Sequence, residues 1–452
     1  PVVPVGTEYK ESAAWMPVQP TDVLPQGDWW TAYGDTELDG LQARLVADSP
    51  DLAAAFARYQ QAQASYAAVR ASLFPSVSTA FNVQSDRQSE TKPLRTPGSS
   101  SPNEYRSSTL GFGLGYEVDL WGRVSNTVAA GRALDRAAKD DLASARLSLQ
   151  AQLADSYLVL RGLDRQVGLL RDTEAAYLRA LELITKRHDG GIASGLDVSR
   201  AQAQVETTRS QLHQTLGQRA LVEHAIASLV GVPAPDFTIE PRVTDIRLPE
   251  IPVGVPSTLL QRRPDVAAAE RRVEAANASV GVSKSAFFPA LTLDAVYGFQ
   301  SSELQGLVSA PNVFWAVGPT LFLELFDGGR RQAELARAEA VLDEAGANYR
   351  IVVLDAFQQV EDNLALLENY RTAAAAEAAA VAATTRSLEF ATTRYREGVS
   401  SYLDVVVSQT GSLATRRESE DLTTRQLRAS VQLIRALGGG WTTHRKDADP
   451  QP

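Results

Sequence analysis

The same sixteen-residue pattern, R-x-x-x-G-x-x-S-x-L-D-V-x-x-x-Q, occurs twice in this 452-residue chain, at 187–202 and at 394–409. Seven defined residues recur in the same order and spacing, which indicates a duplicated unit. A repeated sequence folds into a repeated structure. The chain is therefore expected to combine two similar units of about two hundred residues, and a domain count from length alone does not apply.

A second pair of segments supports the duplication. Residues 50–75 and 264–289 share 11 identities in 26 positions at an offset of 214. Leu120 and Leu325 match at an offset of 205, whereas the two motifs match at 207. We therefore predict one loop-length change before Leu120 and another directly after it.

Composition excludes several classes of protein. The formal charge of −10 and the pI near 5.1 argue against a nucleic-acid partner, because phosphate binding needs clustered Lys and Arg. No run of about 18 apolar residues occurs, so a helical membrane protein is not expected. The chain has no cysteine, which suits an oxidising compartment, and because it begins at Pro1 it reads as a mature or trimmed chain.

Two long stretches have strong helix-forming composition. No proline occurs from Thr127 to His188, and apolar residues there recur at steps of three and four. Residues 331–396 repeat this coiled-coil rhythm. The apolar positions are Leu153, Tyr157, Leu160, Leu163, Val167, Leu170, Tyr177, Leu181 and Ile184, and then Tyr349, Val353, Phe357, Val360, Leu364 and Leu367.

Each long helix is expected to end at the repeated motif, which predicts a tight turn between antiparallel helices. Glycines and serines there supply left-handed or turn conformations, and Asp197 or Asp404 lies in the first turn of the next helix, where an acidic group complements the helix dipole. The turn residues are Gly190, Gly191, Ser194 and Gly195 in the first motif and Gly398, Ser400 and Ser401 in the second.

Segments 75–84, 109–121, 290–300 and 313–326 alternate apolar and polar residues, which is the period of a strand. One face suits lipid and the other water, and about ten residues is the length of a tilted bilayer-spanning strand. Two hairpins result, one in each half. Four strands cannot close a barrel alone, and in a bilayer unpaired edges are costly, so the edges are expected to pair with other copies.

Acidic residues on the polar strand face would line such a barrel and favour cations. The alternative is the solvated face of a soluble sheet. The residues are Glu117, Asp119, Asp294 and Glu324.

The turn motif serves either as a docking tip or only as a device that reverses the helix. Each otherwise polar turn carries one leucine, Leu196 in the first and Leu403 in the second, which favours contact with a partner. No metal-ligand spacing, phosphate loop or catalytic constellation is found. We therefore expect neither an enzyme nor a cofactor.

These features together resemble the outer-membrane factors of tripartite export systems, the TolC/OprM type, and within them the OprM-like efflux lipoproteins grouped under the NodT name. The resemblance covers nearly the whole chain. It rests on Tyr116–Arg123 at the exit from a strand, its counterpart Leu325–Arg330, the turns at Phe74-Pro75 and Phe288-Pro289, the two Leu-Asp-Val tips and the segment 436–441.

The resemblance implies a mostly α-helical chain with a transmembrane β-barrel. Three copies contribute four strands each to one 12-stranded barrel, which an antiparallel coiled-coil tunnel continues across the periplasm. The turn tips would meet a periplasmic adaptor and form a gate, with an inner-membrane pump as a further partner. Arg394, Tyr395 and Leu403 fall on family positions associated with that constriction.

Two departures from the family pattern are visible. Val407 stands where the family often has an Asp four residues after the second tip leucine, so Asp404 or Asp197 is expected to supply the acidic gate ring. Many OprM-like members acylate an N-terminal cysteine, and here the chain begins at Pro1. A lipid anchor is therefore a hypothesis only.

The expected function is a passive, gated exit duct of the bacterial outer membrane that exports drugs or other small molecules from the periplasm. A type I secretion conduit for proteins and a non-channel periplasmic coiled-coil scaffold are the alternatives.

The expected organisation is an N-terminal segment with a short helix (1–49), a first repeat (50–232; hairpin 75–121, helices 124–188 and 196–230), a linker and equatorial segment (233–262), a second repeat (263–437; hairpin 290–326, helices 329–396 and 402–437) and a tail (438–452).

Overall fold

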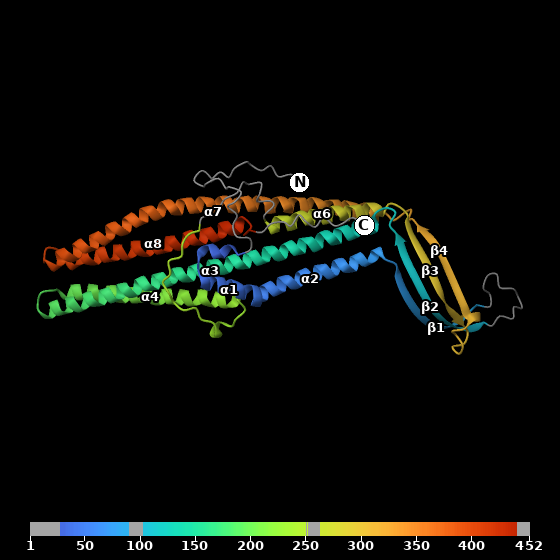
Figure 1. Cartoon of the computed structure of the whole chain (residues 1–452), viewed down its shortest axis with the longest axis horizontal. Helices are drawn as coiled ribbons and strands as arrows, with labels where there is room; N and C mark the ends of the chain where they lie inside the picture. Colours follow the sequence, from blue (N-terminus) through green and yellow to red (C-terminus); the bar gives the residue numbers. More distant parts are fainter. Residues whose placement is uncertain (1–27, 90–102, 250, 252–262, 441–452) are drawn as a thin grey trace. The chain divides into compact units, whose positions relative to one another are not determined.

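The computed structural model of the chain combines long helices with one antiparallel sheet (Figure 1). Residues 441–452 of the tail expected at 438–452 and most of the N-terminal segment lie outside the described residues. The residues that the structure describes are 28–89, 103–249, 251 and 263–440.

The chain divides into two compact units, and each unit contains parts of both sequence repeats. The helical unit comprises Pro1–Tyr59, Lys139–Ala268 and Arg350–Pro452, and the sheet unit comprises Gln60–Ala138 and Ala269–Tyr349.

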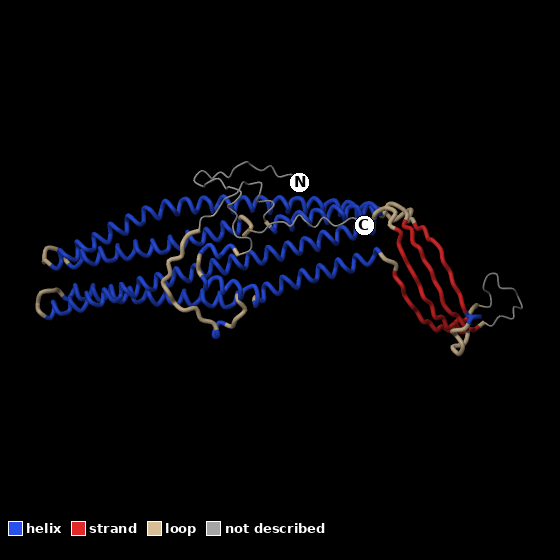
Figure 2. The backbone as a smooth tube through the Cα atoms, viewed as in Figure 1, coloured by secondary structure: helices blue, strands red, loops and turns tan. Residues whose placement is uncertain are grey.

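The strands of the sheet unit are all antiparallel and lie in the order β1-β2-β3-β4, so β2 and β3 also pair with each other (Figure 2). The outer edges of β1 and β4 have no strand beside them among the described residues. The four strands are β1 (Ser76–Arg87), β2 (Glu104–Val118), β3 (Ala290–Ser301) and β4 (Val313–Phe322).

Side chains on the two faces of the sheet differ in polarity as the alternation predicted. Residues that lie opposite one another on neighbouring strands share a face. One such row is Val77, Leu114, Ala295 and Val317, and another is Phe81, Leu110, Phe299 and Val313. The adjacent row on the other face is Ser76, Gly115, Asp294 and Gly318.

The strand register corrects the expected repeat offsets. Ser76 lies opposite Gly115, and Ala290, which is 214 residues after Ser76, lies opposite Phe322, which is 207 residues after Gly115. The offset of 205 at Leu120 is therefore wrong. A single length change, in the loop between the paired strands, explains both offsets. Alternation could not reveal this, because a shift of two residues leaves every side chain on the same face.

Two expected strand segments also end earlier than predicted. Segment 109–121 ends as a strand at Val118 and segment 313–326 at Phe322. β3 begins at Ala290, the partner of Phe322, so no strand residue of the same chain pairs with position 323. The apolar alternation of residues 323–326 therefore has no strand partner within one chain.

The helices match the predicted periodicity closely. The two longest run for 67 residues each, and each is followed by a helix of 35 residues. The helices are α1 (Thr36–Asp48), α2 (Pro50–Arg70), α3 (Arg123–Asp189), α4 (Gly195–Leu229), α6 (Pro264–Ser285), α7 (Arg330–Arg396) and α8 (Tyr402–Ala436).

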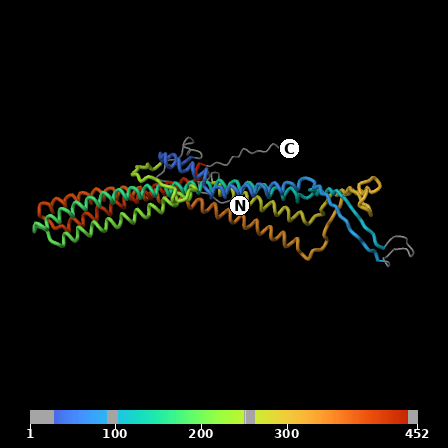
Figure 3. The backbone as a smooth tube through the Cα atoms, turned by 90° about the horizontal axis from the view of Figure 1, so that it is seen from below, coloured from blue at the N-terminus to red at the C-terminus, as the bar shows by residue number. Residues whose placement is uncertain are grey.

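In the helical unit, α4 folds back along α3 and α8 folds back along α7, and the two hairpins lie side by side (Figures 1 and 3). The predicted coiled-coil positions form the buried seam: Leu153, Leu170 and Ile184 of α3 are almost completely buried. Val353, Val360 and Leu364 of α7 are buried in the same way, whereas Tyr349 and Phe357 are only half-buried. Each such side chain contributes about 1.5–3 kcal/mol through burial.

Candidate functional site

Both helix-reversal turns have the same backbone geometry. At the first, the amide of Gly191 donates to the carbonyl of His188 (2.8 Å) and the amide of Ile192 donates to Arg187 (2.8 Å). At the second, Gly398 donates to Tyr395 (3.1 Å) and Val399 to Arg394 (2.9 Å). These bond pairs form Schellman motifs, which require a left-handed residue just after the helix.

Gly191 and Gly398 are the residues that adopt this left-handed conformation, with φ of 75° and 78°. A side chain at either position would strain the backbone. Gly190 and Gly195 were grouped with them in the sequence interpretation, but neither has a positive φ. Gly195 is instead the first residue of α4.

The helices that follow the two turns begin differently. Ser194 caps α4: its hydroxyl accepts from the amide of Asp197 (3.2 Å), and the Asp197 carboxylate accepts from the Ser194 amide (3.4 Å). This reciprocal pair is a capping box. Ser401 makes no side-chain cap bond to α8, and no side-chain partner is found for Asp404 among the described residues. The hydroxyl of Ser400 is buried there without a hydrogen-bond partner.

An aromatic cluster joins the two turns within the helical unit. The rings of Tyr395 and Tyr402 are 5.3 Å apart, and the guanidinium carbon of Arg187 lies 5.2 Å from the centre of the Tyr395 ring. Burial, with smaller effects from Tyr395, Tyr177 and Asp197, raises the pKa of Tyr402 to about 12. Tyr402 packs in a core with Ile184, Ala201 and Val405.

Apolar side chains on the surface of the turns are exposed despite this core. Leu196 is 58% exposed and Leu403 is 44% exposed. The predicted gate residue Arg394 is exposed as well. Further exposed apolar residues near the two turns are Ile192, Val399 and Val407.

Only two of the four acidic residues expected on the polar strand face lie within strands. Glu117 belongs to β2, where it forms an ion pair with Arg123. Asp294 belongs to β3, where its carboxylate accepts from the hydroxyl of Thr292 (2.9 Å). Asp119 and Glu324 follow the ends of β2 and β4, so their placement on the strand face is corrected.

The two elbows, defined as residues 117–123 and 324–330, connect a strand to a long helix in the same way. Each has a left-handed glycine before the helix, Gly122 (φ 75°) or Gly329 (φ 91°). An ion pair joins the residues at the ends of each elbow, Glu117 with Arg123 and Glu324 with Arg330 (2.7 Å). The glutamate, the glycine and the arginine each recur at the offset of 207 that the strand register gives.

An aspartate in each elbow accepts hydrogen bonds from amides at the start of the helix. Asp119 accepts from Val124 (2.9 Å) and Ser125 (2.8 Å). Burial raises the pKa of Asp119, but the hydrogen bonds from Ser125 and Val124 outweigh burial and the pKa is lowered. Asp327 accepts from Gly329 and Arg331, and the hydrogen bond from the Arg331 side chain is the main cause that lowers its pKa to about 2.

A cavity of about 160 Å³ lies between the two elbows in the sheet unit, beside the start of β3. Trp121 forms its aromatic wall: the indole stacks on Phe288 at 4.7 Å and donates to the carbonyl of Pro289 (2.8 Å). The residue 207 positions after Trp121 is Gly328, so the second elbow has no counterpart of this wall.

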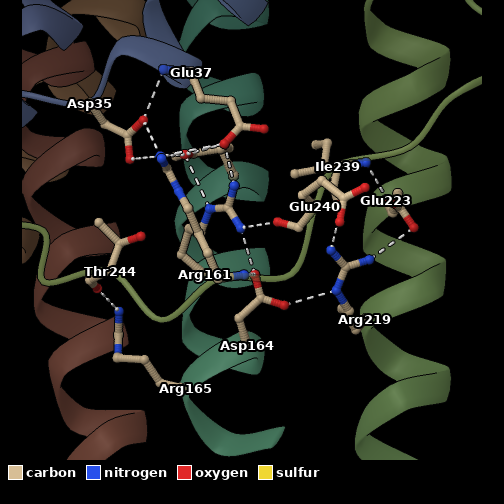
Figure 4. A network of polar contacts seen from close by, with 12 residues as sticks. Asp35, Glu37, Arg161, Asp164, Arg165, Arg219, Glu223, Ile239, Glu240 and Thr244 are labelled. Carbon is tan, nitrogen blue, oxygen red and sulfur yellow. Dashed lines mark hydrogen bonds and ion pairs between the residues drawn. The ribbon is translucent and has the colours of Figure 1, made fainter. Parts of the chain in front are cut away.

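A buried network of charges, which sequence reasoning missed, lies in the helical unit (Figure 4). Arg161 of α3 is fully buried and bonds Asp164 (2.7 Å), Glu37 and the carbonyl of Glu240 (2.9 Å). Asp164 also accepts from Arg219 of α4 (2.8 Å). The network therefore connects α1, α3 and α4 to the segment after α4.

That segment, residues 239–244, is held at several points. Arg219 donates to the carbonyl of Ile239, whose amide donates to Glu223 (2.6 Å). Arg242 donates to both carboxylate oxygens of Asp35 at 2.9 Å, which also caps α1. Charged residues in helices usually indicate a solvated face, so no pattern in the sequence distinguished these from surface residues.

Two kinds of feature are absent from the residues that the structure describes. None of their helices combines the length and the hydropathy that a membrane span needs. No cluster of three or more His, Cys, Asp or Glu side chains in this part of the chain is arranged to hold a metal ion.

Comparison with known proteins identifies the family to which this chain belongs. The sequence model described as "outer membrane efflux protein" matches residues 41–232 and 255–439. The chain belongs to this family. Its relatives match over nearly their full length. OprJ of Pseudomonas aeruginosa is 32% identical, over 98% of this chain and 91% of OprJ. The toluene efflux pump outer membrane protein TtgC of Pseudomonas putida is 30% identical over 100% of this chain and 93% of TtgC.

Solved structures agree with these sequence comparisons. The outer-membrane channel OprN superimposes with a TM-score of 0.90 at 27% identity, over 97% of each chain. The resemblance to TolC/OprM-type factors is thereby confirmed, together with the TolC-like fold. This efflux protein is an outer-membrane channel component of an efflux pump, and its family consists of channels rather than enzymes.

Proposed function

We propose that three copies of this efflux protein form a passive, gated exit duct, in which each copy contributes its four strands to one closed 12-stranded barrel. The observation that carries the proposal is the sheet itself. It has one apolar face, one polar face and two strand edges without partners among the described residues. In a bilayer, unpaired backbone groups at such edges cost several kcal/mol each, so closure with further copies stabilises the barrel.

The turn tips serve as the gate and the docking surface in this proposal. Arg394, Tyr395 and Leu403 form the constriction, and Leu196 and Leu403, with the turns at Gly191, Ser194, Gly195, Gly398 and Ser401, receive the hairpin tips of a periplasmic adaptor. The exposure of both leucines supports docking. Asp197 is occupied by its capping box, whereas no side-chain partner is found for Asp404 among the described residues, so Asp404 supplies the acidic ring.

Small molecules are the proposed cargo, driven by an inner-membrane pump that docks through the adaptor. Relatives are named for toluene efflux, antibiotic efflux and pyoverdine export, which are all small molecules rather than proteins. Asp294, on the polar face of the sheet, favours cations in the lumen, whereas the ion pair with Arg123 offsets the charge of Glu117 on the same face. The duct performs no chemistry, and all energy comes from the pump.

Single-channel current of the detergent-purified protein in a planar lipid bilayer, under a salt gradient, tests this function. Discrete cation-selective steps are expected, and small steps indicate a gate that is mostly shut. Failure to insert, with protein that stays monodisperse without detergent, would contradict the duct and favour a periplasmic scaffold.

A further inference from the structure

A second cavity, of about 140 Å³, lies within the helical unit. Its lining comes from α3, α7, α8 and the start of α6, which are far apart in sequence. A space of this size is comparable with an engineered cavity that holds benzene, so a small molecule fits it. None of its residues takes part in the proposed gate, docking tips or lumen. The polar members of the lining are Ser144, Ser148, Arg263, Asp265, Gln359 and Arg435.

Arg263 is the buried cation of this cavity, and its side chain is well supplied with acceptors. Its guanidinium donates to both carboxylate oxygens of Asp265 (3.0 and 2.6 Å). It also donates to Oε1 of Gln359 (3.0 Å) and to the carbonyl of Ala436 (3.1 Å). The Gln359 amide is thereby oriented: its oxygen faces Arg263, and its nitrogen has no acceptor among the described residues.

Arg435 is the cation of the cavity that lacks a partner. It lies in the last turn of α8 and is partly buried, yet its guanidinium makes no hydrogen bond or ion pair within the described part of the chain. An arginine at this place complements the helix dipole, but its five N–H donors still need acceptors.

The lining cannot supply the missing acceptor. Among its described residues only Asp265 carries a carboxylate, and that group already accepts from Arg263 and from the amide of Val266 (2.9 Å). Because Asp265 offsets one of the two arginines, the lining retains one excess positive charge. An anion from solution would offset this charge and the desolvation of Arg435.

We propose that this cavity binds a phosphate group, held by Arg435, the hydroxyls of Ser144 and Ser148 and the amide nitrogen of Gln359. Each of these groups donates hydrogen bonds and has no acceptor in the described structure. A guanidinium binds phosphate through two parallel hydrogen bonds. Phosphate offers further oxygens to the remaining donors, whereas a carboxylate has only two oxygens. The site goes beyond the proposed duct and depends on neither the closed barrel nor the gate.

A phosphate bound here connects three long helices, because its ligands come from α3, α7 and α8. A ligand that binds the folded state alone stabilises that state in proportion to its occupancy. The phosphate therefore acts as a clip on the helical unit, and we expect the unfolding temperature to rise with its concentration.

Isothermal titration calorimetry of the assembled wild-type protein in detergent tests the site. Inorganic phosphate and glycerol 3-phosphate serve as separate probes, in a phosphate-free buffer of constant ionic strength. Saturable binding is expected. Tighter binding of glycerol 3-phosphate identifies a phosphate monoester as the ligand, and binding of inorganic phosphate alone identifies the free ion. No saturable heat with either probe, together with an unchanged unfolding temperature, would overturn the proposal.

Variants show whether the phosphate occupies this cavity. Arg435→Gln should weaken binding at least about tenfold, because it removes the charge-assisted hydrogen bonds. Arg428→Gln is the matched control on the same helix: Arg428 pairs with Asp155 (2.9 Å) outside the cavity, and binding should not change. Ser148→Asp adds a competing carboxylate to the lining and should abolish binding, which keeps the test available if Arg435→Gln folds poorly. Binding as tight as in the wild type in both Arg435→Gln and Ser148→Asp would refute the site.

Discussion

Ser194 and Ser401 occupy the same place in the two repeats, yet only Ser194 caps its helix. The sequence around them is S-x-L-D-V in both, so the motif alone predicted the same start for both helices. They differ at the following residue, which is Gly195 in one and Tyr402 in the other. Tyr402 is buried in the core of the tips, so packing rather than a capping box fixes the start of α8.

Alanine substitution of the two serines should therefore have unequal effects. Ser194→Ala removes a cap bond, and we expect a local loss of about 1 kcal/mol, which corresponds to about fivefold faster amide exchange over residues 195–198. Ser401→Ala is the matched control and should leave exchange at the start of α8 nearly unchanged. Hydrogen exchange with mass spectrometry measures both, and equal effects would contradict the assigned capping difference.

At the scale of elements, periodicity predicted the long helices, the strands and the turns, because each depends on local spacing. It did not predict where strands end, since Asp119 continues the alternation but serves to cap α3. It also missed the buried network, because the partners of Arg161 come from α1, α3 and residue 240, far apart in sequence. Such contacts depend on tertiary packing, which no local pattern encodes.

Breaking that network should destabilise the helical unit strongly. Arg161→Met leaves Asp164, whose side chain is 1% exposed, without one of its two cationic partners. Loss of a buried partner typically costs about 3–5 kcal/mol. Arg428→Met removes a guanidinium that is 50% exposed beside Asp155 and should change stability by less than about 1 kcal/mol. Chemical unfolding in detergent, followed by circular dichroism, compares the two; similar midpoints would refute the role of the network.

The exposed leucines of the two turns give a prediction for the helical hairpins as elements. Leu196→Ser together with Leu403→Ser removes apolar area from both tips, and we expect adaptor affinity to fall about tenfold, the effect of roughly 1.4 kcal/mol. Multimer mass should not change. Leu221→Ser, an exposed leucine elsewhere on α4, is the control. Surface plasmon resonance with the cognate adaptor measures the effect, and unchanged affinity would exclude contact through these leucines.

For the whole molecule, the sequence predicted an assembly from its edges, but the copy number came only from resemblance. The offset between the repeated strands also escaped sequence analysis, because offsets of 205 and 207 leave the alternation identical. Only the paired positions of β1 with β2 and β3 with β4 distinguished them.

The acidic ring that we propose at the tips would be a property of the assembly, since each copy would contribute one Asp404. Asp404→Asn should lower the cation selectivity of the open duct, because the substitution removes one negative charge per copy from the proposed constriction. Asp197→Asn should alter selectivity less, since Asp197 is bonded within its capping box. Reversal potentials in planar bilayers measure both, and an unchanged reversal potential for Asp404→Asn would remove that residue from the pore.

The diverged elbows and tips have an evolutionary consequence. Because two repeats share one gene, a single codon change alters only every second position around the closed ring. The repeats already differ at equivalent positions: Trp121 corresponds to Gly328, and Ser194 caps its helix whereas Ser401 does not. The opening can thus acquire a new charge or shape at alternate sites while the unchanged repeat preserves assembly. Selection can then adjust cargo without rebuilding the pore.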